Sequence, residues 1–542
     1  MKTFDYIIVG AGSSGCALAN RLSQDPEVNV LLLEAGGSGD SPIIKTPAGL
    51  IISLIFGTFN WCYNALNQRT LNNRAIFCPR GKALGGSSAI NGMLYIRGQR
   101  QDYDLWAEQG NKGWSFDELL PYFKRSQHQE RGASEYHGVG GPLNVANGRS
   151  NQPISADFIK AGTEAGVPFN PDFNGAAQEG IGWYQTTQKD GQRHSAAAAY
   201  LTPVMNRPNL TVITGATTAK VVFEGKKAVG VEYLIKGLRH SATAETEVIL
   251  SGGAFGSPQL LLLSGVGPKA KLDEHGIEQV HELPGVGENL QEHVDVVRVW
   301  KDKTNSAIAM FRPKGIWHLA KDAVNYVIHR RGFLASTMAE SGAFVRSSED
   351  VERPDIQYHF VPAAMDDHGR SLRYNLSYGA SIHTCVLRPY SRGSVSLASS
   401  DPTADPIIDL NMLSDSRDMD TLKAGLRKLD EIVSAPSLAQ RLSYSIIPKQ
   451  EPASDQELEQ FIRAKANNIY HPVGTCKMGN DEMAVVDDEL RVHGLEGLRV
   501  VDASIMPTLI SGNTNAPSMV IGEKAADMIL AARVADTQEQ VA

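Results

Sequence analysis

The first 37 residues contain a strand, a glycine turn, a helix and a second strand, and no other stretch constrains the fold as strongly. Residues 6–9 are a short apolar run typical of a buried strand, and GAGSSG follows at 10–15. Small residues at 16–22 predict a helix, and the apolar residues 30–33 predict a second strand that ends at Glu34. In such a unit the glycines permit a tight turn and a close backbone approach to a pyrophosphate, which the helix N-terminus attracts. We therefore predict a dinucleotide site in which Glu34 accepts the hydroxyls of an adenosine ribose.

Length and composition limit the class of protein. A chain of 542 residues is long enough for about two to four domains. Its net charge of −8 argues against a nucleic-acid partner. The five cysteines are scattered without a CxxC pair, which indicates free thiols in a reducing compartment. The early first strand leaves no room for a signal peptide, and no apolar run approaches the roughly 20 residues of a membrane span. We expect a cytoplasmic enzyme, in contact with a membrane surface at most.

The strand-and-glycine style of the N-terminus returns twice later in the chain. Short buried strands are predicted at 211–213, 221–223, 246–250 and 498–501, with a turn at 225–228. Helices are predicted to start at 258 and to cover 518–532. We therefore expect a discontinuous, Rossmann-like α/β dinucleotide-binding domain made of residues 1–155, 205–299 and 455–542.

The intervening residues have a different pattern. Alternating strands are predicted at 355–361, 381–387 and 393–397, and helices at 316–329 and 421–434. Residues 182–200 predict a strand, a turn and a strand that lead into a helix. We expect an α+β substrate-binding domain, an antiparallel sheet with helices, made of residues 156–204 and 300–454.

The most apolar short run is GLIISLIF at 49–56. It fits a buried strand or helix turn, or alternatively an apolar loop at a substrate entrance or a membrane contact. Its length rules out a membrane span.

Several long segments resemble the glucose-methanol-choline (GMC) family of flavin oxidoreductases, in the family's order. They are the N-terminal turn with Glu34, RGKALGGSSAINGM at 80–93, SGGAFGSPQLLLLSGVGP at 251–268, LPGVGENLQEH at 283–293, YHPVGTCKMG at 470–479 and VVDASIMPTLISGNTNAPSMVIGEKAADMI at 500–529. The resemblance implies FAD in the opening site and oxidation of an alcohol to a carbonyl.

Within that family the chain is most similar to the aliphatic alcohol dehydrogenases of bacterial alkane pathways, with the choline dehydrogenases closely related. The supporting stretches are FNGAAQEGIGWYQTTQKDGQRHSAAAAYL at 173–201, AESGAFVRSS at 339–348 and DIQYHFVPAAMDDHGR at 355–370. Such enzymes are membrane-associated without a transmembrane helix and pass electrons to quinones.

The resemblance also implies the cofactor-binding residues. Gly10, Gly12, Gly15 and Glu34 match the positions that bind ADP in the family, and the backbone of Val221 matches the adenine contact. The matching segments supply the remaining positions: Ser13, Ser14, Ala35, Arg80, Gly81, Leu84, Gly85, Gly86, Ser88, Asn91, Gly92, Met93, Gly253, Asp502, Ala503 and Asn515. Members with a covalent flavin carry a histidine around position 90. Because this chain has Ile90, we expect noncovalent FAD.

His471 and Asn513 match the family's catalytic pair, and their chemistry suits the reaction. Moving a hydride from an alcohol carbon to flavin N5 requires that the hydroxyl proton leave and that the alkoxide be stabilised. An imidazole can accept that proton. An amide N–H can hold the oxygen and place the carbon over N5.

Other polar residues have simpler explanations. Asp366, Asp367 and His368 suggest a metal or a cationic substrate, but no partner ligands with zinc-like spacing occur, so we expect a solvated turn and no metal. Glu340 and Arg346 are expected to be structural. An aromatic cage for choline has three candidates, Trp183, Tyr184 and Tyr358, which nothing in the sequence places together.

The sequence thus predicts FAD-dependent oxidation of a primary, aliphatic or otherwise apolar alcohol, with electrons passed to a quinone-type acceptor. Choline dehydrogenase and an alcohol oxidase that uses O₂ are alternatives. A lyase or photodecarboxylase on the same scaffold is an alternative of another class. The presence of both His471 and Asn513 counts against that class.

Overall fold

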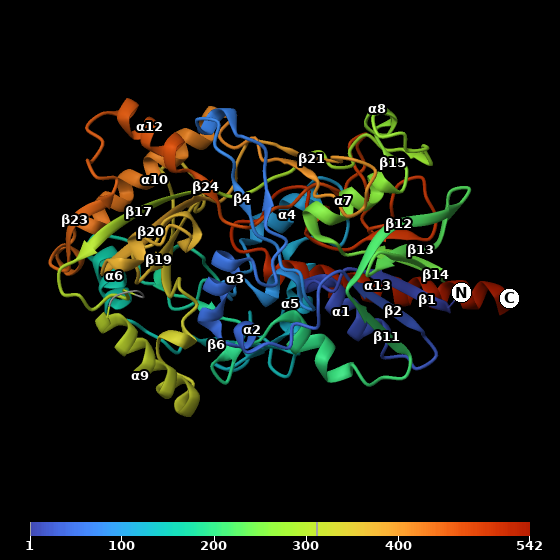
Figure 1. Ribbon diagram of the computed structural model, residues 1–542, viewed down its shortest axis with the longest axis horizontal. Coiled ribbons are helices and arrows are strands. Elements are labelled where there is room, and N and C mark those ends of the chain that lie inside the picture. Colours follow the sequence, from blue (N-terminus) through green and yellow to red (C-terminus); the bar gives the residue numbers. More distant parts are fainter. Residues whose placement is uncertain (1, 310–312, 542) are drawn as a thin grey trace.

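The computed structural model describes residues 2–309 and 313–541 and contains two seven-stranded sheets. Figure 1 shows one sheet at the right, around β1 and β14, and the other at the left, around β17 and β20. The first sheet has the order β11-β2-β1-β14-β13-β12, and β25 pairs with β14. Its strands are β1 (Lys2–Val9), β2 (Val30–Glu34), β11 (Leu210–Thr214), β12 (Ala216–Glu224), β13 (Lys227–Ile235), β14 (Leu238–Leu250) and β25 (Leu498–Val500).

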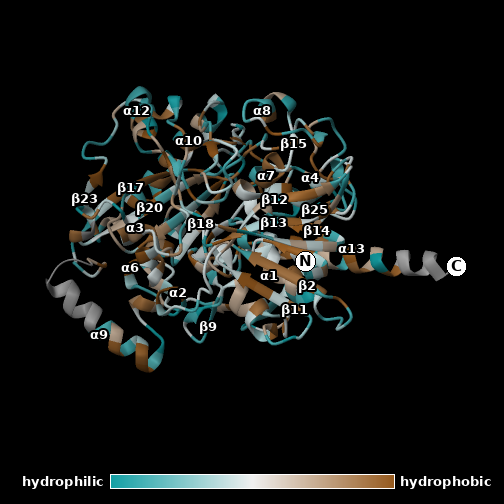
Figure 2. Ribbon diagram, turned by 45° about the vertical axis from the view of Figure 1, so that its right-hand side comes forward, coloured by the Kyte–Doolittle hydropathy of each residue, from teal (hydrophilic) through white to brown (hydrophobic). Residues whose placement is uncertain are grey.

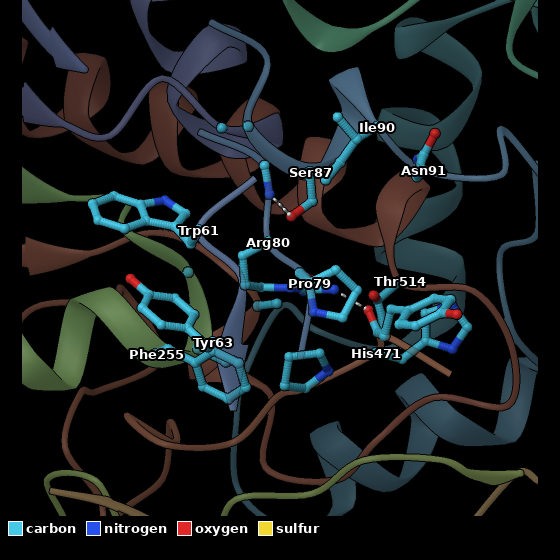
Figure 3. A pocket seen from close by; sticks show the side chains of 18 of the residues that line it. Trp61, Tyr63, Pro79, Arg80, Ser87, Ile90, Asn91, Phe255, His471 and Thr514 are labelled. Carbon is cyan, nitrogen blue, oxygen red and sulfur yellow. Dashed lines mark hydrogen bonds between the residues drawn. The ribbon is translucent and has the colours of Figure 1, made fainter. Parts of the chain in front are cut away.

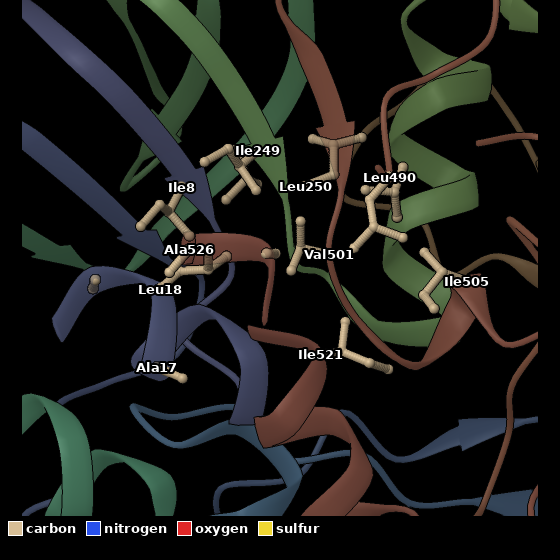
Figure 4. Close-up of a cluster of buried hydrophobic side chains, with 14 of the residues drawn as sticks. Ile8, Ala17, Leu18, Ile249, Leu250, Leu490, Val501, Ile505, Ile521 and Ala526 are labelled. Carbon is tan, nitrogen blue, oxygen red and sulfur yellow. The ribbon is translucent and has the colours of Figure 1, made fainter. Parts of the chain in front are cut away.

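The first sheet is parallel where helices cover it. β1 pairs in parallel with β2 and β14, and the end of β14 pairs in parallel with β25. All five residues of β2 (VLLLE) are buried, as expected for a strand covered on both faces, and Figure 2 colours the strand as hydrophobic. Helices α1 (Ser13–Leu22) and α13 (Asn515–Val541) pack tightly together, since a Cβ on Gly522 would lie 2.6 Å from the carbonyl oxygen of Ser14. Figure 4 shows Ile8 of β1 beside Leu18 of α1 and Ala526 of α13.

The second sheet is antiparallel, with the order β23-β17-β20-β19-β18-β7, and β24 pairs with β17. Its strands are β7 (Gly180–Trp183), β17 (Val294–Asp302), β18 (Ser341–Val345), β19 (Ile356–Val361), β20 (Gly379–Val386), β23 (Leu442–Ile447) and β24 (Asn467–Asn468). Successive side chains of a strand point to opposite faces. In β19, Ile356, Tyr358 and Phe360 join a core with α6 (Pro153–Glu164) and α10 (Ser416–Ser434), whereas His359 and Val361 line a cavity on the other face.

Further helices and strands surround these two layers. The helices are α2 (Pro42–Lys45), α3 (Leu50–Phe56), α4 (Arg100–Glu108), α5 (Phe116–Ser126), α7 (Gly253–Leu263), α8 (Lys269–Asp273), α9 (Pro313–His329), α11 (Pro436–Ala439) and α12 (Asp455–Lys465). The strands are β3 (Tyr63–Asn64), β4 (Phe77–Cys78), β5 (Gln127–Gln129), β6 (Leu143–Asn147), β8 (Gln185–Thr186), β9 (Gln188–Lys189), β10 (Gln192–Arg193), β15 (Val266–Gly267), β16 (His281–Glu282), β21 (Ser394–Ser396) and β22 (Ile407–Asp409). Within the described residues, no helix is both long and apolar enough to cross a membrane.

The mixed fold class predicted from the sequence is confirmed, with local corrections. The predicted strand 393–397 is β21, which pairs with β22 outside the large sheet, and α7 begins at Gly253 instead of residue 258. The expected domain boundary at residue 299 falls inside β17, because this strand begins directly after the LQEH segment at 290–293 and continues past residue 299. The apolar run at 49–56 forms the short helix α3.

Candidate active site

A cavity of about 420 Å³ extends from the glycine turn after β1 to the second sheet. One end is lined by Gly10, Gly12 and Glu34, and the other by His359 and His383. We call these the nucleotide end and the reactive end. Figure 3 shows part of the cavity wall, with Trp61, Tyr63 and Phe255 grouped across Arg80 and Pro79 from His471.

The turn at the nucleotide end requires glycine because backbones meet there. Gly10 has a φ of +103°, and a Cβ on it would lie 2.4 Å from the carbonyl oxygen of Ser251. Gly86 has a φ of +51°, and its Cβ would lie 2.7 Å from the Cα of Gly12. The cavity wall is therefore bare backbone at these points, which suits close approach of a ligand.

Helices α1, α7 and α13 begin at the nucleotide end of the cavity. The Ser13 hydroxyl donates to Asn515 Oδ1 at 2.8 Å, so the N-termini of α1 and α13 meet at the wall, and α7 starts at Gly253 in the same wall. Helix N-termini carry a partial positive charge and unpaired N–H groups. Their convergence suits a pyrophosphate.

Glu34 is buried and fixed by two backbone groups. Its carboxylate accepts the N–H of Ala11 at 3.0 Å and that of Gly36 at 2.7 Å, while burial raises its pKa to about 7. The side chain lines the cavity at the end of β2, where the sequence places a ribose-binding acid.

Asp502 also lines the cavity, but its carboxylate is occupied by the protein. It accepts the N–H of Gly253 at 2.8 Å, the hydroxyl of Ser257 at 2.5 Å and the N–H of Ser504 at 2.8 Å. Burial raises its pKa. Asp502 therefore fixes the start of α7 against the segment after β25.

His471 lies at the reactive end between two partners. Its Nε2 is 3.1 Å from Asn513 Nδ2, and its Nδ1 is 3.0 Å from Nδ1 of His293. Burial, with the neighbouring His293, His359 and Arg80, holds the pKa of His471 well below the usual range of histidine. The imidazole is therefore neutral near pH 7 and can accept a proton.

The main chain around His471 is held as well. Its N–H donates to Glu292 Oε1 at 2.6 Å, and Arg80 Nη2 donates to the carbonyl oxygen of Tyr470 at 2.6 Å. Burial raises the pKa of Glu292 to about 8, against the opposing charge of Arg80. The segment that carries His471 is thus anchored on both sides of that residue.

The second sheet contributes polar side chains that the sequence reading did not select. Asp295, His359 and His383 line the cavity from β17, β19 and β20, and Asp295 Oδ2 is 2.6 Å from His383 Nδ1. Burial lowers the pKa of His359 to about 3, and neither of its ring nitrogens has a hydrogen-bond partner in the described part of the chain. Each of these residues lies on a different strand, and His359 is the cross-strand partner of His383. The alternation of side chains along a strand was the available signal, but it does not reveal which face of the sheet meets the cavity.

Most of the predicted site residues do line this cavity. They are Gly10, Gly12, Ser13, Ser14, Glu34, Ala35, Arg80, Gly81, Gly86, Asn91, Gly92, Met93, Gly253, His471, Asp502, Ala503, Asn513 and Asn515. The wall does not include Gly15, Leu84, Gly85, Ser88 or Val221.

Local packing explains three of these exceptions. A Cβ on Gly15 would lie 2.0 Å from the carbonyl oxygen of Gly10, so this glycine serves the turn itself. The Val221 N–H donates to Ser264 Oγ at 2.9 Å, and residues 216–218, earlier on β12, line the cavity instead. The Ser88 hydroxyl donates to the carbonyl oxygen of Gly85 at 2.5 Å, while its neighbour Ser87 faces the cavity.

The expected solvated turn at 366–368 is wrong for its histidine. His368 lines the cavity, its ring bonds to the Tyr470 hydroxyl, and burial lowers its pKa to about 3. Asp366 binds Lys465 at 2.7 Å, and only Asp367 stays half exposed, at 49%. Among the described residues, no group of three or more histidines, cysteines or acids could hold a metal ion.

Glu340 has the structural role that we expected, and the three cage residues lie outside the cavity wall. The Glu340 carboxylate accepts the Gln152 N–H at 2.8 Å. The Tyr184 hydroxyl donates to the carbonyl oxygen of Tyr358 at 2.7 Å, and neither tyrosine nor Trp183 lines the cavity.

Part of the cavity wall is apolar. It contains Leu50 and Leu54 of α3 with Met338 and Met365, which join one buried cluster. The short helix α3 thus supplies cavity wall on one side.

Comparison with known proteins identifies relatives of this chain. Two models of the GMC oxidoreductase family match residues 4–295 and 389–522. The alcohol dehydrogenase [acceptor] of Pseudomonas putida is 48% identical over 97% of this chain and 96% of its own. The mitochondrial choline dehydrogenase of Homo sapiens is 43% identical over 97% of this chain and 89% of its own.

Solved structures superpose on this fold over nearly the whole length of the chain. Pyridoxine 4-oxidase from Mesorbium loti superposes with a TM-score of 0.87 at 31% identity, over 97% of this chain and 98% of the other. Formate oxidase from Aspergillus oryzae, described for the modification of its FAD, superposes with a TM-score of 0.90 at 28% identity, over 98% of each chain. The chain therefore belongs to the GMC oxidoreductase family.

Proposed function

We propose that this protein oxidises a primary, apolar alcohol to its aldehyde with FAD and passes the electrons to a quinone-type acceptor. The observation that carries this proposal is the pair His471 and Asn513, 3.1 Å apart in the wall of a cavity whose other end suits a dinucleotide. The names of the relatives, alcohol dehydrogenase and choline dehydrogenase, support a small alcohol as substrate.

The nucleotide end fits FAD. Glu34 would hold the adenosine ribose, and the converging starts of α1, α7 and α13 would hold the pyrophosphate. The bare backbone at Gly10 and Gly86 leaves space that a Cβ would fill. Ile90 lines the cavity and has no group that forms a bond to flavin, which supports noncovalent FAD. Bound flavin supplies the hydride acceptor of the reaction.

The protein's part in the chemistry is to move a proton and to hold an oxygen. Oxidation of the alcohol releases one hydride from carbon and one proton from oxygen. His471 Nε2 accepts that proton, and Asn513 donates an amide N–H to the same oxygen as it gains negative charge. Acid–base assistance of this kind contributes about 10²–10⁴-fold to a rate.

The apolar wall of Leu50, Leu54 and Met365 favours an aliphatic substrate over a cation. Choline is the second candidate, because Asp295 Oδ1 has no hydrogen-bond partner among the described residues and could face an ammonium group. Against choline, the other oxygen of Asp295 already binds His383, which lies in the same cavity wall.

We propose that the protein works in the cytoplasm, at the inner face of the cell membrane. The support is the outer side of α3, where Ile52 and Phe56 are exposed, the latter at 75%, while Leu50 and Leu54 of the same helix line the cavity. A substrate or quinone in the lipid would thus be near the cavity. Loss of vesicle binding in Phe56→Glu would support this location, and equal binding would contradict it.

The function is tested by adding compounds to the purified, yellow protein without oxygen. We expect medium-chain primary alcohols to bleach the flavin spectrum faster than choline does, with a quinone analogue restoring the colour. Faster bleaching by choline would assign the second candidate. Turnover in air with stoichiometric peroxide would indicate an oxidase. Products formed from carboxylic acids in light, or without any change in flavin oxidation state, would indicate a photodecarboxylase or a lyase and overturn the proposal.

A further inference from the structure

His293 lies behind His471 and is fully buried. It follows Glu292, which holds the main chain of His471, so two consecutive residues bind the proposed base: one at its backbone and one at its ring. The two imidazole planes are nearly perpendicular, at 85°.

The hydrogen bonds of His293 fix where its proton lies. Its Nε2 is 2.9 Å from the carbonyl oxygen of Leu387 and 3.1 Å from that of Ile510. Carbonyl oxygens only accept, so this nitrogen carries the proton. In a neutral imidazole the other nitrogen is then an acceptor. His471 Nδ1, 3.0 Å away, must donate to it, which leaves Nε2 of His471 without a proton.

A second chain of hydrogen bonds fixes the amide of Asn513. The Tyr184 hydroxyl donates its only O–H to the carbonyl oxygen of Tyr358, so its oxygen can only accept a hydrogen bond from Gln357 Nε2 at 3.1 Å. The same amide nitrogen is 3.3 Å from Asn513 Oδ1 and donates to it. The amide nitrogen of Asn513 must therefore face His471.

The two chains of hydrogen bonds each end on backbone carbonyl oxygens, and they meet at the proposed catalytic pair. One presents a bare Nε2 and the other an amide N–H, 3.1 Å apart. The opposite tautomer of His471 would set two N–H groups against each other at this contact and two unprotonated nitrogens against each other at His293. The arrangement is thus consistent only when Nε2 is the free base.

We infer that His293 is a positioning residue that sets the tautomer of His471, and that Gln357 sets the orientation of Asn513 in the same way. This inference rests on the proposed function of the pair. The alcohol oxygen accepts a hydrogen bond from the second amide N–H of Asn513, its hydroxyl proton moves to His471 Nε2, and the Nδ1 proton stays on His471, bonded to His293. No proton passes to His293, whose pKa burial lowers to about 4.

The direct test is ¹⁵N NMR of the flavin-containing protein with labelled histidine. The His471→Gln spectrum identifies the His471 signals by their loss. We expect a protonated Nδ1 and an unprotonated Nε2 for His471 at pH 7. A protonated Nε2 in the native protein would overturn the inference without any variant of His293.

The kinetic test uses His293→Phe, which keeps a ring but removes the acceptor, and His293→Asn, which keeps an acceptor. We expect His293→Phe to slow flavin reduction at saturating alcohol by about 10- to 100-fold, the loss typical when a partner that orients a metal-binding imidazole is removed. The alcohol concentration for half-maximal rate should change less than about threefold, and His293→Asn should recover about tenfold of the rate.

His137→Phe is the matched control, since His137 is a buried histidine bonded to Asp172 at 2.7 Å and lies outside the cavity wall. An unchanged rate and tautomer in His293→Phe, alongside a large loss in His471→Gln, would overturn the inference and leave the function intact. Unimpaired reduction in His471→Gln would instead refute the function.

Discussion

The two ends of the cavity are built in different ways. The nucleotide end is mainly backbone: glycine turns, helix N-termini and the fixed carboxylate of Glu34. The reactive end is made of side chains, with His471 and Asn513 held by residues 178 and 156 positions away in the sequence. A backbone site binds a common cofactor and tolerates little change in shape. A side-chain site defines the chemistry, and single substitutions can remove it without disturbing the fold.

Asn513→Ala should have the largest effect on the rate of flavin reduction with the least effect on FAD binding. Loss of the amide removes one donor to the developing alkoxide, which typically costs about 10²–10³-fold in rate. The FAD content should equal that of the native protein, because Asn513 is at the far end of the cavity from Glu34. Stopped-flow reduction and the flavin-to-protein absorbance ratio measure the two effects. A variant that loses FAD in proportion to its activity would contradict the separation.

Gly10→Ala should have the converse effect. The added Cβ would meet the Ser251 carbonyl at 2.4 Å, at a φ of +103°. Overpacking of this kind costs about 1–3 kcal/mol, which corresponds to about 5- to 150-fold weaker FAD retention. Gly37→Ala is the matched control, since a Cβ there meets nothing within 4 Å. The rate per bound flavin should be unchanged, and FAD binding by Gly10→Ala as tight as that of the control would refute the packing argument.

The smallest contrast concerns the free energy of unfolding, which His359 and Glu34 should change in opposite directions as the pH varies. Burial lowers the pKa of His359 to about 3, below its unfolded value near 6.5, so the unfolded state binds the extra proton between these values. The fold therefore loses stability as the pH falls from about 6.5, at about 1.4 kcal/mol per pH unit. Burial raises the pKa of Glu34 to about 7, so this residue makes the fold lose stability as the pH rises from about 4.5 to 7.

Urea denaturation of His359→Phe and Glu34→Gln from pH 4.5 to 6.5 measures how each residue changes the free energy of unfolding with pH. Relative to the native protein, His359→Phe should lose less stability on acidification, by about 2 kcal/mol over this range. Glu34→Gln should lose less stability as the pH rises. Parallel curves for all three proteins would show that neither group titrates as its burial requires.

The same contrast explains what the sequence could predict. The strand, turn, helix and strand that end at Glu34 are contiguous, so local pattern was sufficient for the nucleotide end. His471 and Asn513 were reached through family resemblance. Their partners His293 and Gln357 were not selected, since their placement depends on how the second sheet meets the first, and no local pattern encodes that register. Val221 shows the same limit on a smaller scale, because its strand was predicted but the wall residues lie at 216–218.

The most direct test of the account is anaerobic flavin reduction by a primary alcohol in His471→Gln. The account predicts a rate lower by about 10²–10⁴-fold, with the FAD content and the flavin spectrum of the native protein. A native reduction rate in this variant, at full FAD occupancy, would contradict the central claim that the reactive end chooses the chemistry through His471.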